Sequence, residues 1–474
     1  MLIVLDLYTL GIIATVLLFL PQVFVYVLYS LLILRSRSKS RGLSEYALKS
    51  AHDISFIIPV KREPLDYVER AIRRICELEI PGEEIIVVSD DDPTIKDEIL
   101  RVVSRARSNG CNVWFVWRSI PRNARTGAIN TGLFASKNPY VYVVDVDTYP
   151  ERCFLDVAVS ILESSAEYAC IVGRWEPLNY DSRLSAALAA GLKYMVTVLY
   201  RARSRLGLYT YPLGTGTLFR SDVLKNILGG WDEQRIQDDM EVGARIMHIG
   251  LRVAYVDDCA IYVENPSSYK AFRVQQYRWA YGAVDTAISR VKHILCSKYP
   301  LLVRLDALFY LLQYIPQVLA FLGGLLLAVT VLVKPLDYIL LVYPLLLVYA
   351  GSMILHSLVL YREARLTTQS TWNAVTQMGR LAAVTSAISL YTLIGTLKAI
   401  LRVKADYKRT PKGLHQRVYS QLRAPWEILL GLLFLSSSAV AVLNSAYLTA
   451  LILLLHAATY IYILVRYPRD VFYK

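Results

Sequence analysis

The chain has 474 residues and a formal net charge of +13, and 55% of its residues are hydrophobic. With a mean hydropathy of +0.38, it is too apolar for an ordinary soluble protein. The positive residues cluster beside apolar runs, where Lys and Arg mark the cytosolic side of a membrane. We therefore expect a lipid bilayer, and no nucleic acid, among its partners.

The first apolar run, residues 2–34, contains one charged residue, Asp6. It exceeds the ~20 residues that a helix needs to cross a bilayer. It also lacks a cleavage-site pattern, which favours a membrane anchor over a secretory signal peptide. Basic residues follow at 35–41, so the N-terminus is expected outside and the next domain in the cytosol. We assign residues 1–49 to this anchor and a basic linker, and the protein to the cell (plasma) membrane.

Residues 50–265 alternate short Val/Ile-rich runs with helical patterns. Near-continuous apolar strands separated by helices are typical of a parallel sheet covered on both faces. We therefore predict a doubly wound, Rossmann-like α/β domain. The predicted strands are 54–60, 84–89, 111–117 and 140–146, and the helices between them are 64–79, 94–107 and 126–137.

Acidic residues follow two of these strands. "SDDD" (89–92) ends the second strand and "DVD" (145–147) ends the fourth. Ligands bind outside the carboxyl ends of strands in open parallel sheets, and paired carboxylates there suit Mg²⁺ or Mn²⁺ on a diphosphate. One such cluster is more simply a turn former or helix cap. Two clusters at one edge favour a ligand site, in which Asp145 and Asp147 face the same side of an extended chain.

Two further segments carry weaker signals. "QDDME" (237–241) opens a predicted helix, where carboxylates often only interact with the helix dipole. A base that deprotonates a sugar hydroxyl would also be a fixed carboxylate near the donor, and sequence position leaves both possibilities open. "YPLGTGTLFR" (211–220) is a small-residue loop of the kind that lets a ligand approach the backbone closely.

The stretch "RVQQYRW" (273–279) precedes a long apolar region. If it is helical, Gln275, Arg278 and Trp279 stand at i, i+3 and i+4 on one face. The spacing fits either a membrane-surface helix or a substrate-binding face. We assign residues 266–304 to interfacial helices that contain this stretch.

The C-terminal part contains two apolar hairpins, residues 305–361 and 426–474. Between them lies the segment 362–425, whose apolar centre, 374–401, has basic residues on both sides. Positive flanks at both ends predict an interfacial or re-entrant segment rather than a span. The chain would then cross the membrane five times and end in the cytosol.

Six cysteines occur singly, without a CxxC pair or Cys/His cluster. This pattern argues against a zinc site, and we expect reduced, mostly buried thiols. His52 and His248 are isolated and are predicted to be ordinary histidines rather than metal ligands. Trp175 fits core packing as well as a sugar contact.

Taken in order, these motifs resemble the processive family 2 glycosyltransferases, the group of cellulose, mannan and hyaluronan synthases. The set comprises the acids at 90–92, "DVD" at 145–147, "DD" at 238–239, and "QQYRW" at 275–279, which matches the family's QxxRW. "KRTPKG" (408–413) resembles the gating loop that follows an interfacial helix in such enzymes. The resemblance implies a cytosolic GT-A glycosyltransferase domain inserted between transmembrane helices.

The resemblance also implies which residues bind the donor, a UDP- or GDP-linked sugar. Asp90 or Asp91 would contact the base and ribose, because three acids in a row blur the alignment. Asp147, with Asp145 nearby, would hold Mg²⁺ or Mn²⁺ on the diphosphate. The other donor contacts would be Arg125, Gln275 and Arg278.

The remaining motif residues would serve catalysis and the acceptor. Asp239 would be the general base, beside Asp238, which stands where the family usually has Glu. Arg125 similarly stands where the family usually has Lys. Acceptor contacts would come from Gly214, Thr215, Gly216 and Trp279, and the gating loop would contribute Thr410 and Lys412.

One carboxylate base without a second, nucleophilic acid fits single displacement with inversion, so an α-linked donor gives a β-linked product. The resemblance thus predicts an enzyme that extends a polysaccharide and passes it outward through its own helices. The run from 237 to 282 looks especially like the cellulose synthase-like mannan synthases, although the sequence leaves the sugar open.

Two alternatives remain open. A non-processive enzyme would place one sugar on a polyprenyl phosphate or a ceramide-like lipid; the two trailing hairpins and the TPKG loop favour a polymer instead. A transporter with a nucleotide-binding insert would need functional polar residues within its spans. The spans here are mostly apolar, with Gln313 and His356 as the main exceptions.

Overall fold

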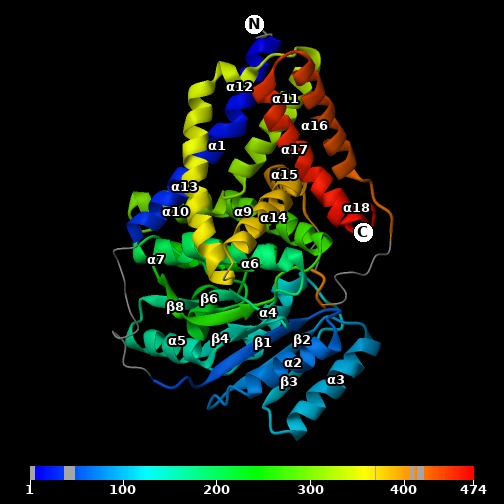
Figure 1. The fold of residues 1–474 in the computed structure, drawn as a ribbon. Coiled ribbons are helices and arrows are strands. Elements are labelled where there is room, and N and C mark those ends of the chain that lie inside the picture. Colours follow the sequence, from blue (N-terminus) through cyan, green and yellow to red (C-terminus); the bar gives the residue numbers. More distant parts are fainter. Residues whose placement is uncertain (1–5, 37–48, 369, 406–409, 414–420, 474) are drawn as a thin grey trace.

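The computed structural model describes residues 6–36, 49–368, 370–405, 410–413 and 421–473. A sheet domain forms one end of the molecule, and long helices rise from it into a bundle whose far end contains the start of the first helix (Figure 1). Several predicted features lie outside the described residues: Arg37, Lys39 and Arg41 of the basic linker, and Lys408 and Arg409 of the gating loop.

The domain contains an eight-stranded sheet with the order β3-β2-β1-β4-β7-β6-β8-β5. β1, β2, β3 and β4 are parallel, as predicted. β7 runs antiparallel to β4 and β6, and β5 antiparallel to β8. The α/β class is confirmed, but the sheet is mixed: β6 and β8 are also parallel to each other and run in the direction of β1–β4, whereas β5 and β7 run in the opposite direction. The strands are β1 (Ile54–Val60), β2 (Glu84–Ser89), β3 (Val113–Trp117), β4 (Tyr140–Val143), β5 (Thr148–Pro150), β6 (Tyr168–Pro177), β7 (Thr217–Arg220) and β8 (Arg252–Val263).

Helices cover both faces of the sheet because its central strands are apolar on both sides. Phe56 and Ile58 of β1 belong to the core shared with α2 (Leu65–Cys76), α3 (Pro93–Ser108) and α5 (Arg152–Ser164). Ile57, between them, belongs to the opposite core, with α4 (Ala124–Ala135) and α8 (Asp238–His248). The other helices that precede α11 in the chain are α6 (Arg183–Val196), η2 (Thr197–Ala202), α7 (Arg203–Arg205), η3 (Val223–Ile227), α9 (Tyr269–Leu295) and α10 (Leu301–Leu311).

Among the described residues, five helices are long and apolar enough to cross a membrane. They coincide with the predicted apolar runs: α1 (Leu7–Ser36), α11 (Ile315–Val333), α13 (Tyr343–Thr367), α16 (Trp426–Leu443) and α17 (Tyr447–Arg466). The apolar segment 374–401 lies largely in α14 (Thr371–Ala387) and α15 (Ser389–Ile400). The axes of these two helices differ by 44°, and together they make either a broken span or a re-entrant loop. Its interfacial or re-entrant placement therefore stays a prediction. The short helices α12 (Tyr338–Leu341) and α18 (Pro468–Phe472) complete this part.

α1 and α11 pack against each other without a gap. A Cβ atom at Gly323 of α11 would lie 2.5 Å from the Leu18 nitrogen and 2.7 Å from the Ala14 oxygen of α1. Small residues allow transmembrane helices to approach this closely. We call this contact the α1–α11 seam.

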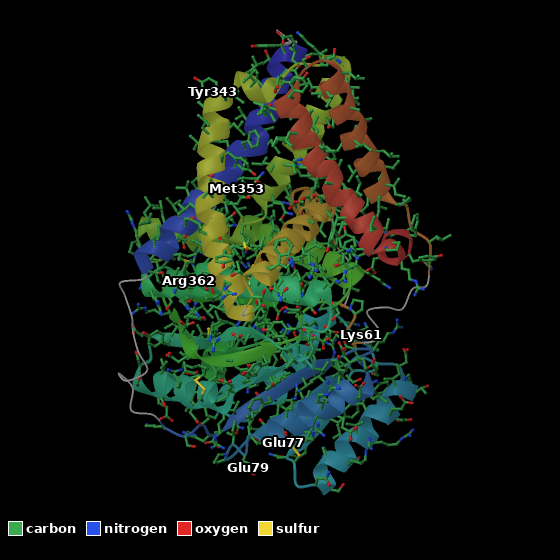
Figure 2. All side chains as sticks on the ribbon, in the orientation of Figure 1. Lys61, Glu77, Glu79, Tyr343, Met353 and Arg362 are labelled. Carbon is green, nitrogen blue, oxygen red and sulfur yellow. A yellow bond between two sulfur atoms is a disulfide. The ribbon has the colours of Figure 1, made fainter. Side chains whose placement is uncertain are left out.

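Two disulfides link segments of the sheet domain, so the prediction of reduced thiols is wrong for four of the cysteines. Cys76 at the end of α2 pairs with Cys111 before β3, and Cys153 of α5 pairs with Cys259 of β8 (Figure 2). The partners are 35 and 106 residues apart in sequence, with Cα atoms 5.8 and 5.9 Å apart. Their pairing depends on the tertiary fold, which spacing along the chain does not reveal.

We expect Cys153→Ser to destabilise the domain, because the lost disulfide closes a loop of 106 residues. Chain entropy assigns about 4–5 kcal/mol to such a loop, so the thermal unfolding midpoint should fall clearly. Cys296→Ser, which removes an exposed free thiol, is the matched control and should leave the midpoint unchanged. Thiol titration of the denatured, unreduced wild-type chain should find only Cys170 and Cys296; six reactive thiols would contradict the disulfides.

Candidate active site

A cavity of about 1410 Å³ begins at the carboxyl edge of the parallel strands and continues among the helices of the bundle. It exceeds the roughly 300–1,000 Å³ of an ordinary small-molecule pocket, so it has room for a donor and an acceptor together. All but two of the candidate residues line it: Asp90, Arg125, Asp145, Asp147, Gly214, Thr215, Asp238, Asp239, Gln275, Arg278, Trp279, Thr410 and Lys412.

The two exceptions, Asp91 and Gly216, have structural contacts instead. The Asp91 carboxylate accepts hydrogen bonds from the Arg62 backbone N–H and the Ser89 hydroxyl. Gly216 has a φ of +93°, and a Cβ atom there would lie 2.9 Å from Nε1 of Trp175. The structure thus separates Asp90, which faces the cavity, from its neighbour Asp91.

Asp90 is held by an arginine that the sequence analysis missed. Arg118 donates from Nε to Oδ1 at 2.6 Å and from Nη2 to Oδ2 at 2.7 Å. This bidentate pair fixes the plane of the carboxylate at the end of β2. Arg118 itself directly follows β3, so the strand-end rule that selected the acids also applies to it.

Arg125, in the first turn of α4, connects three parts of the cavity wall. Its guanidinium donates to the Asp238 carboxylate, to Asp145 Oδ1 at 3.1 Å and to the Gly214 carbonyl oxygen at 2.7 Å. Burial raises the pKa of Asp145, but the charges of Arg125 and Lys412 outweigh burial and leave this pKa below its ordinary value. These two cations therefore favour the ionised form of the Asp145 carboxyl group.

Asp239 lies in the first turn of α8 and is buried. Oδ2 accepts a hydrogen bond from the Gly214 N–H at 2.9 Å, and Oδ1 accepts from the Met240 N–H at 2.7 Å and from Gln237 at 2.8 Å. Burial, followed by the charge of Asp238, raises the pKa of Asp239 to about 6. A carboxyl group with this pKa can accept a proton near neutral pH more effectively than an exposed aspartate.

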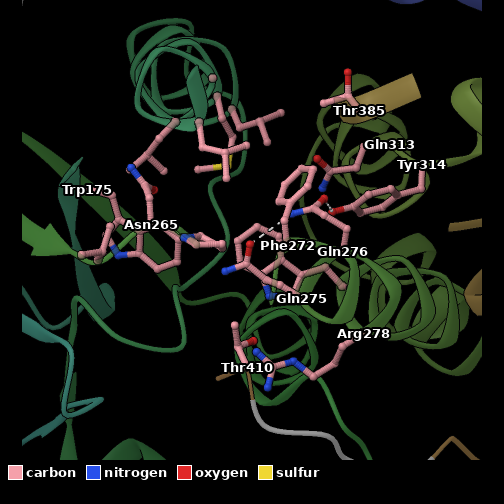
Figure 3. A pocket seen from close by; sticks show the side chains of 18 of the residues that line it. Trp175, Asn265, Phe272, Gln275, Gln276, Arg278, Gln313, Tyr314, Thr385 and Thr410 are labelled. Carbon is pink, nitrogen blue, oxygen red and sulfur yellow. Dashed lines mark hydrogen bonds between the residues drawn. The ribbon is translucent and has the colours of Figure 1, made fainter. Parts of the chain in front are cut away.

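The stretch "RVQQYRW" is helical, and its predicted face lines the cavity. α9 begins at the N-cap Ser268, whose hydroxyl accepts a hydrogen bond from the Ala271 N–H. Gln275, Arg278 and Trp279 share the cavity wall with Gln276, which accepts a hydrogen bond from the Tyr314 hydroxyl at 3.0 Å (Figure 3).

Trp175 also borders the cavity, which sequence reasoning left undecided. Its Nε1 donates to the Thr215 carbonyl oxygen at 2.9 Å. The centroid of its ring lies 6.5 Å from that of the Trp279 ring. These two indole rings, close to Thr215, provide apolar faces against which a pyranose ring can stack. His52 and His248 lie outside this wall and pair with neighbouring side chains or backbone.

Comparison with known proteins agrees with this arrangement. A family model described as glycosyl transferase family group 2 matches residues 140–355. The chain is 29% identical over 461 residues to a probable glycosyltransferase of Sulfolobus acidocaldarius, covering 94% of this chain and 96% of that one. It is 30% identical to glucomannan 4-beta-mannosyltransferase 7 of Arabidopsis thaliana, over 48% of this chain and 42% of the relative. The matched family model and these relatives support a family 2 glycosyltransferase.

A solved structure shares the fold. The mannosyltransferase of Pyrobaculum calidifontis, in complex with GDP-Man and Mn²⁺, aligns with a TM-score of 0.58 and 17% identity, covering 84% of this chain and all of that one. The glycosyltransferase has the GT-A fold and, by its apolar helices, belongs to a membrane. These similarities support a transferase rather than the alternative of a transporter with a nucleotide-binding insert. The chain spans about half the length of the plant mannosyltransferases it matches.

Segment 410–413 of the glycosyltransferase reaches the metal-site candidates. Lys412 Nζ lies 3.0 Å from Asp147 Oδ1 and 3.7 Å from Glu63 Oε1. Burial lowers the pKa of Lys412, but the nearby Asp147, Glu63 and Asp145 outweigh burial and raise this pKa above its usual value. The Gly413 N–H donates to Glu264, which also accepts from the Tyr67 hydroxyl. Lys412 is thus a fixed cation in the cavity.

Asp145 and Asp147 face the cavity from a turn rather than from an extended strand. β4 ends at Val143, and the Thr148 N–H donates to the Asp145 carbonyl oxygen at 2.9 Å. Within the part of the chain that the structure describes, no group of three or more His, Cys, Asp or Glu residues is arranged as a metal site. The two carboxylates do fit Mg²⁺ or Mn²⁺, which bind proteins through one or two carboxylates and take further ligands from phosphates and water.

The two positions that depart from the family pattern, Arg125 and Asp238, contact each other. Arg125 has a longer side chain than the Lys usual in the family, and Asp238 a shorter one than the usual Glu, so the Arg125–Asp238 pair stands in place of a Lys–Glu pair. We expect Arg125→Lys and Asp238→Glu each to lower kcat/KM, and the double variant to recover part of the loss. In a double-mutant cycle the coupling energy should be about 1–3 kcal/mol.

Arg122→Gln is the control for this cycle, since Arg122 is exposed and contributes only a backbone oxygen to the site. It should not change kcat/KM. Strictly additive effects of the two single substitutions would show that the Arg125–Asp238 contact does not matter for catalysis.

Proposed function

We propose that the glycosyltransferase transfers a hexosyl group, with inversion, from a nucleotide diphosphate sugar to a hydroxyl of a growing β-linked saccharide. The observation that carries this proposal is the continuity of one cavity. One end of the cavity contains the carboxylates at the strand ends and the carboxyl group of Asp239, whose pKa is raised. The same cavity continues among polar and aromatic side chains of the helices.

Each chemical step has a residue in place. The acceptor hydroxyl gives its proton to Asp239 while its oxygen attacks the anomeric carbon of the donor. The bond from that carbon to the diphosphate breaks, and its electron pair leaves with the nucleoside diphosphate. Arg278, which lines the cavity, offsets the charge that develops there. Asp90, held by Arg118, would orient the nucleoside.

Asp147 and Asp145 would hold Mg²⁺ or Mn²⁺ on the diphosphate. The ion would supply positive charge to the leaving group. Thr410 is a further candidate for a phosphate contact, because its hydroxyl is buried at the cavity wall with no hydrogen-bond partner among the described residues (Figure 3).

GDP-mannose is the donor that we propose first. The Arabidopsis relatives are named as mannosyltransferases, and the Pyrobaculum structure is a complex with GDP-Man. UDP-glucose and UDP-N-acetylglucosamine, which the sequence also allows, are the competing donors.

A saccharide acceptor fits the extension of the cavity. Beyond Trp175 and Trp279, the wall contains polar and aromatic side chains, including Gln313 in the turn before α11 and His356 on α13. Buried polar groups in a membrane bundle are costly and usually serve a ligand or pathway. The wall therefore favours a polar chain over an entirely apolar acceptor.

Export of the product through the helices stays a prediction. Gln22, Phe321, Tyr349 and His456 are the cavity-lining residues nearest the far ends of their helices. Beyond Gln22 and Phe321, α1 and α11 are in close contact at the α1–α11 seam. We also propose that the sheet domain faces the cytosol at the plasma membrane, since the basic residues Arg35, Arg466 and Arg469 follow the domain-side ends of α1 and α17.

The decisive experiment offers labelled GDP-mannose, UDP-glucose and UDP-N-acetylglucosamine to purified protein with Mg²⁺ or Mn²⁺. We expect one donor, GDP-mannose, to label a product of several sugars, and chelation of the metal to stop labelling. Asp239→Asn should reduce turnover about 100-fold or more and retain donor binding. Recovery of a monoglycosylated lipid alone would contradict processive extension, and turnover retained in Asp239→Asn would contradict the assigned base.

The pKa of about 6 at Asp239 predicts where kcat/KM begins to fall on the acid side of its pH profile, the acid limb. Because the base must be deprotonated, kcat/KM should fall about tenfold per pH unit below this value. Asp238→Asn removes the like charge, so the limb should shift to lower pH. The exposed Asp222→Asn is the control and should leave the limb in place; an unshifted limb in Asp238→Asn would contradict the coupling.

A further inference from the structure

One side of the cavity is bordered by α13 and α14. Residues at helical spacing on one face of α13 and one face of α14 line it. These residues are Tyr349, Met353, His356 and Leu360 on α13, and Val375, Gly379, Ala382 and Ser386 on α14. Met353 is 40% exposed and Val375 50% exposed, and a Cβ atom at Gly379 would meet nothing within 4 Å. We call these eight residues the α13–α14 window, since they border both the cavity and the outside of the bundle.

The window lies at the depth of the lipid tails. Met353 is midway along α13, and Arg362 marks the end of that helix nearer the sheet domain (Figure 2). Only 11% of the most apolar stretch of α13 is buried within the protein, so the outer side of the window faces the hydrocarbon layer.

The inner wall behind the window is polar. The Tyr194 hydroxyl lies 2.9 Å from His356 Nδ1, and the His356 ring stacks on Tyr26 with a centroid distance of 4.3 Å. The Tyr26 hydroxyl donates to Gln22 at 3.0 Å. A molecule in the window thus meets Met353 and Val375 on the outside and this hydrogen-bonding wall within. Such an environment suits a ligand with an apolar tail and a polar head.

We propose that the α13–α14 window admits an acceptor saccharide carried on a membrane lipid through a phosphate. The tail stays between α13 and α14, and the saccharide reaches Asp239 through the polar part of the cavity. The exposed Arg362 at the foot of α13 provides positive charge for an anionic head group at the membrane surface. This inference rests on the proposed sugar transfer and specifies how its acceptor is anchored.

The test compares two Gly→Leu substitutions. Gly379→Leu places a side chain in the window, whereas Gly351→Leu adds the same side chain on α13 outside the cavity wall, where a Cβ atom also meets nothing within 4 Å. Both variants are reconstituted in liposomes with labelled donor. The acceptors are mannobiose linked through phosphate to a phytanyl chain, and free mannobiose at matched concentration.

We expect the ratio of lipid-linked to free product to fall about tenfold or more in Gly379→Leu, a change of ~1.4 kcal/mol. In Gly351→Leu the ratio should stay within about twofold of wild type, the range of surface substitutions. An unchanged ratio in Gly379→Leu, or wild-type protein that labels free mannobiose but never the phytanyl-linked sugar, would overturn the window. Failure to label either acceptor would instead overturn the proposed sugar transfer.

Discussion

The largely buried guanidinium of Arg125 holds the candidate active site together. It joins Asp145 after β4, the Gly214 carbonyl and Asp238 at the start of α8. A planar cation with several fixed donors can satisfy such a set, and a buried carboxylate without this partner would be costly. The same contact separates two neighbouring acids. Asp238 takes the cation, while Asp239 keeps mainly amide donors and a raised pKa of about 6, the property that a base requires.

The parts of the fold that depend on local pattern were predictable from sequence. β1 and β2 have the predicted bounds, because continuous Val/Ile runs identify strands buried on both faces. Helical spacing placed Gln275, Arg278 and Trp279 on one face of α9, but it did not show whether that face meets a membrane surface or a substrate. The direction of β7 and the partners of Cys153 and Cys76 did not follow, since each depends on a segment far away in sequence. A single chain shows local periodicity, whereas strand order and disulfide pairing are tertiary properties.

The same limit separates the site residues. Sequence placed acids at the sheet edge but left Asp90 and Asp91 equivalent, because their difference comes from distant partners. Arg118 arrives from the end of β3 and pairs with Asp90. The Arg62 N–H and the Ser89 hydroxyl instead occupy Asp91. The burial that raises the pKa of Asp239 was equally invisible, since it is created by helices that the alternation pattern does not position.

The contact between Lys412 and Asp147 connects the donor end of the cavity to the membrane helices. α15, the last helix before segment 410–413, packs against α9 so closely that a Cβ atom at Gly395 would lie 2.6 Å from the Tyr277 oxygen. α9 in turn presents Gln275, Arg278 and Trp279 to the cavity. A divalent cation at Asp147 would share that carboxylate with the Lys412 ammonium, 3.0 Å away. The two cations would then compete for one anion, so the position of segment 410–413 and the occupancy of the donor site would depend on each other.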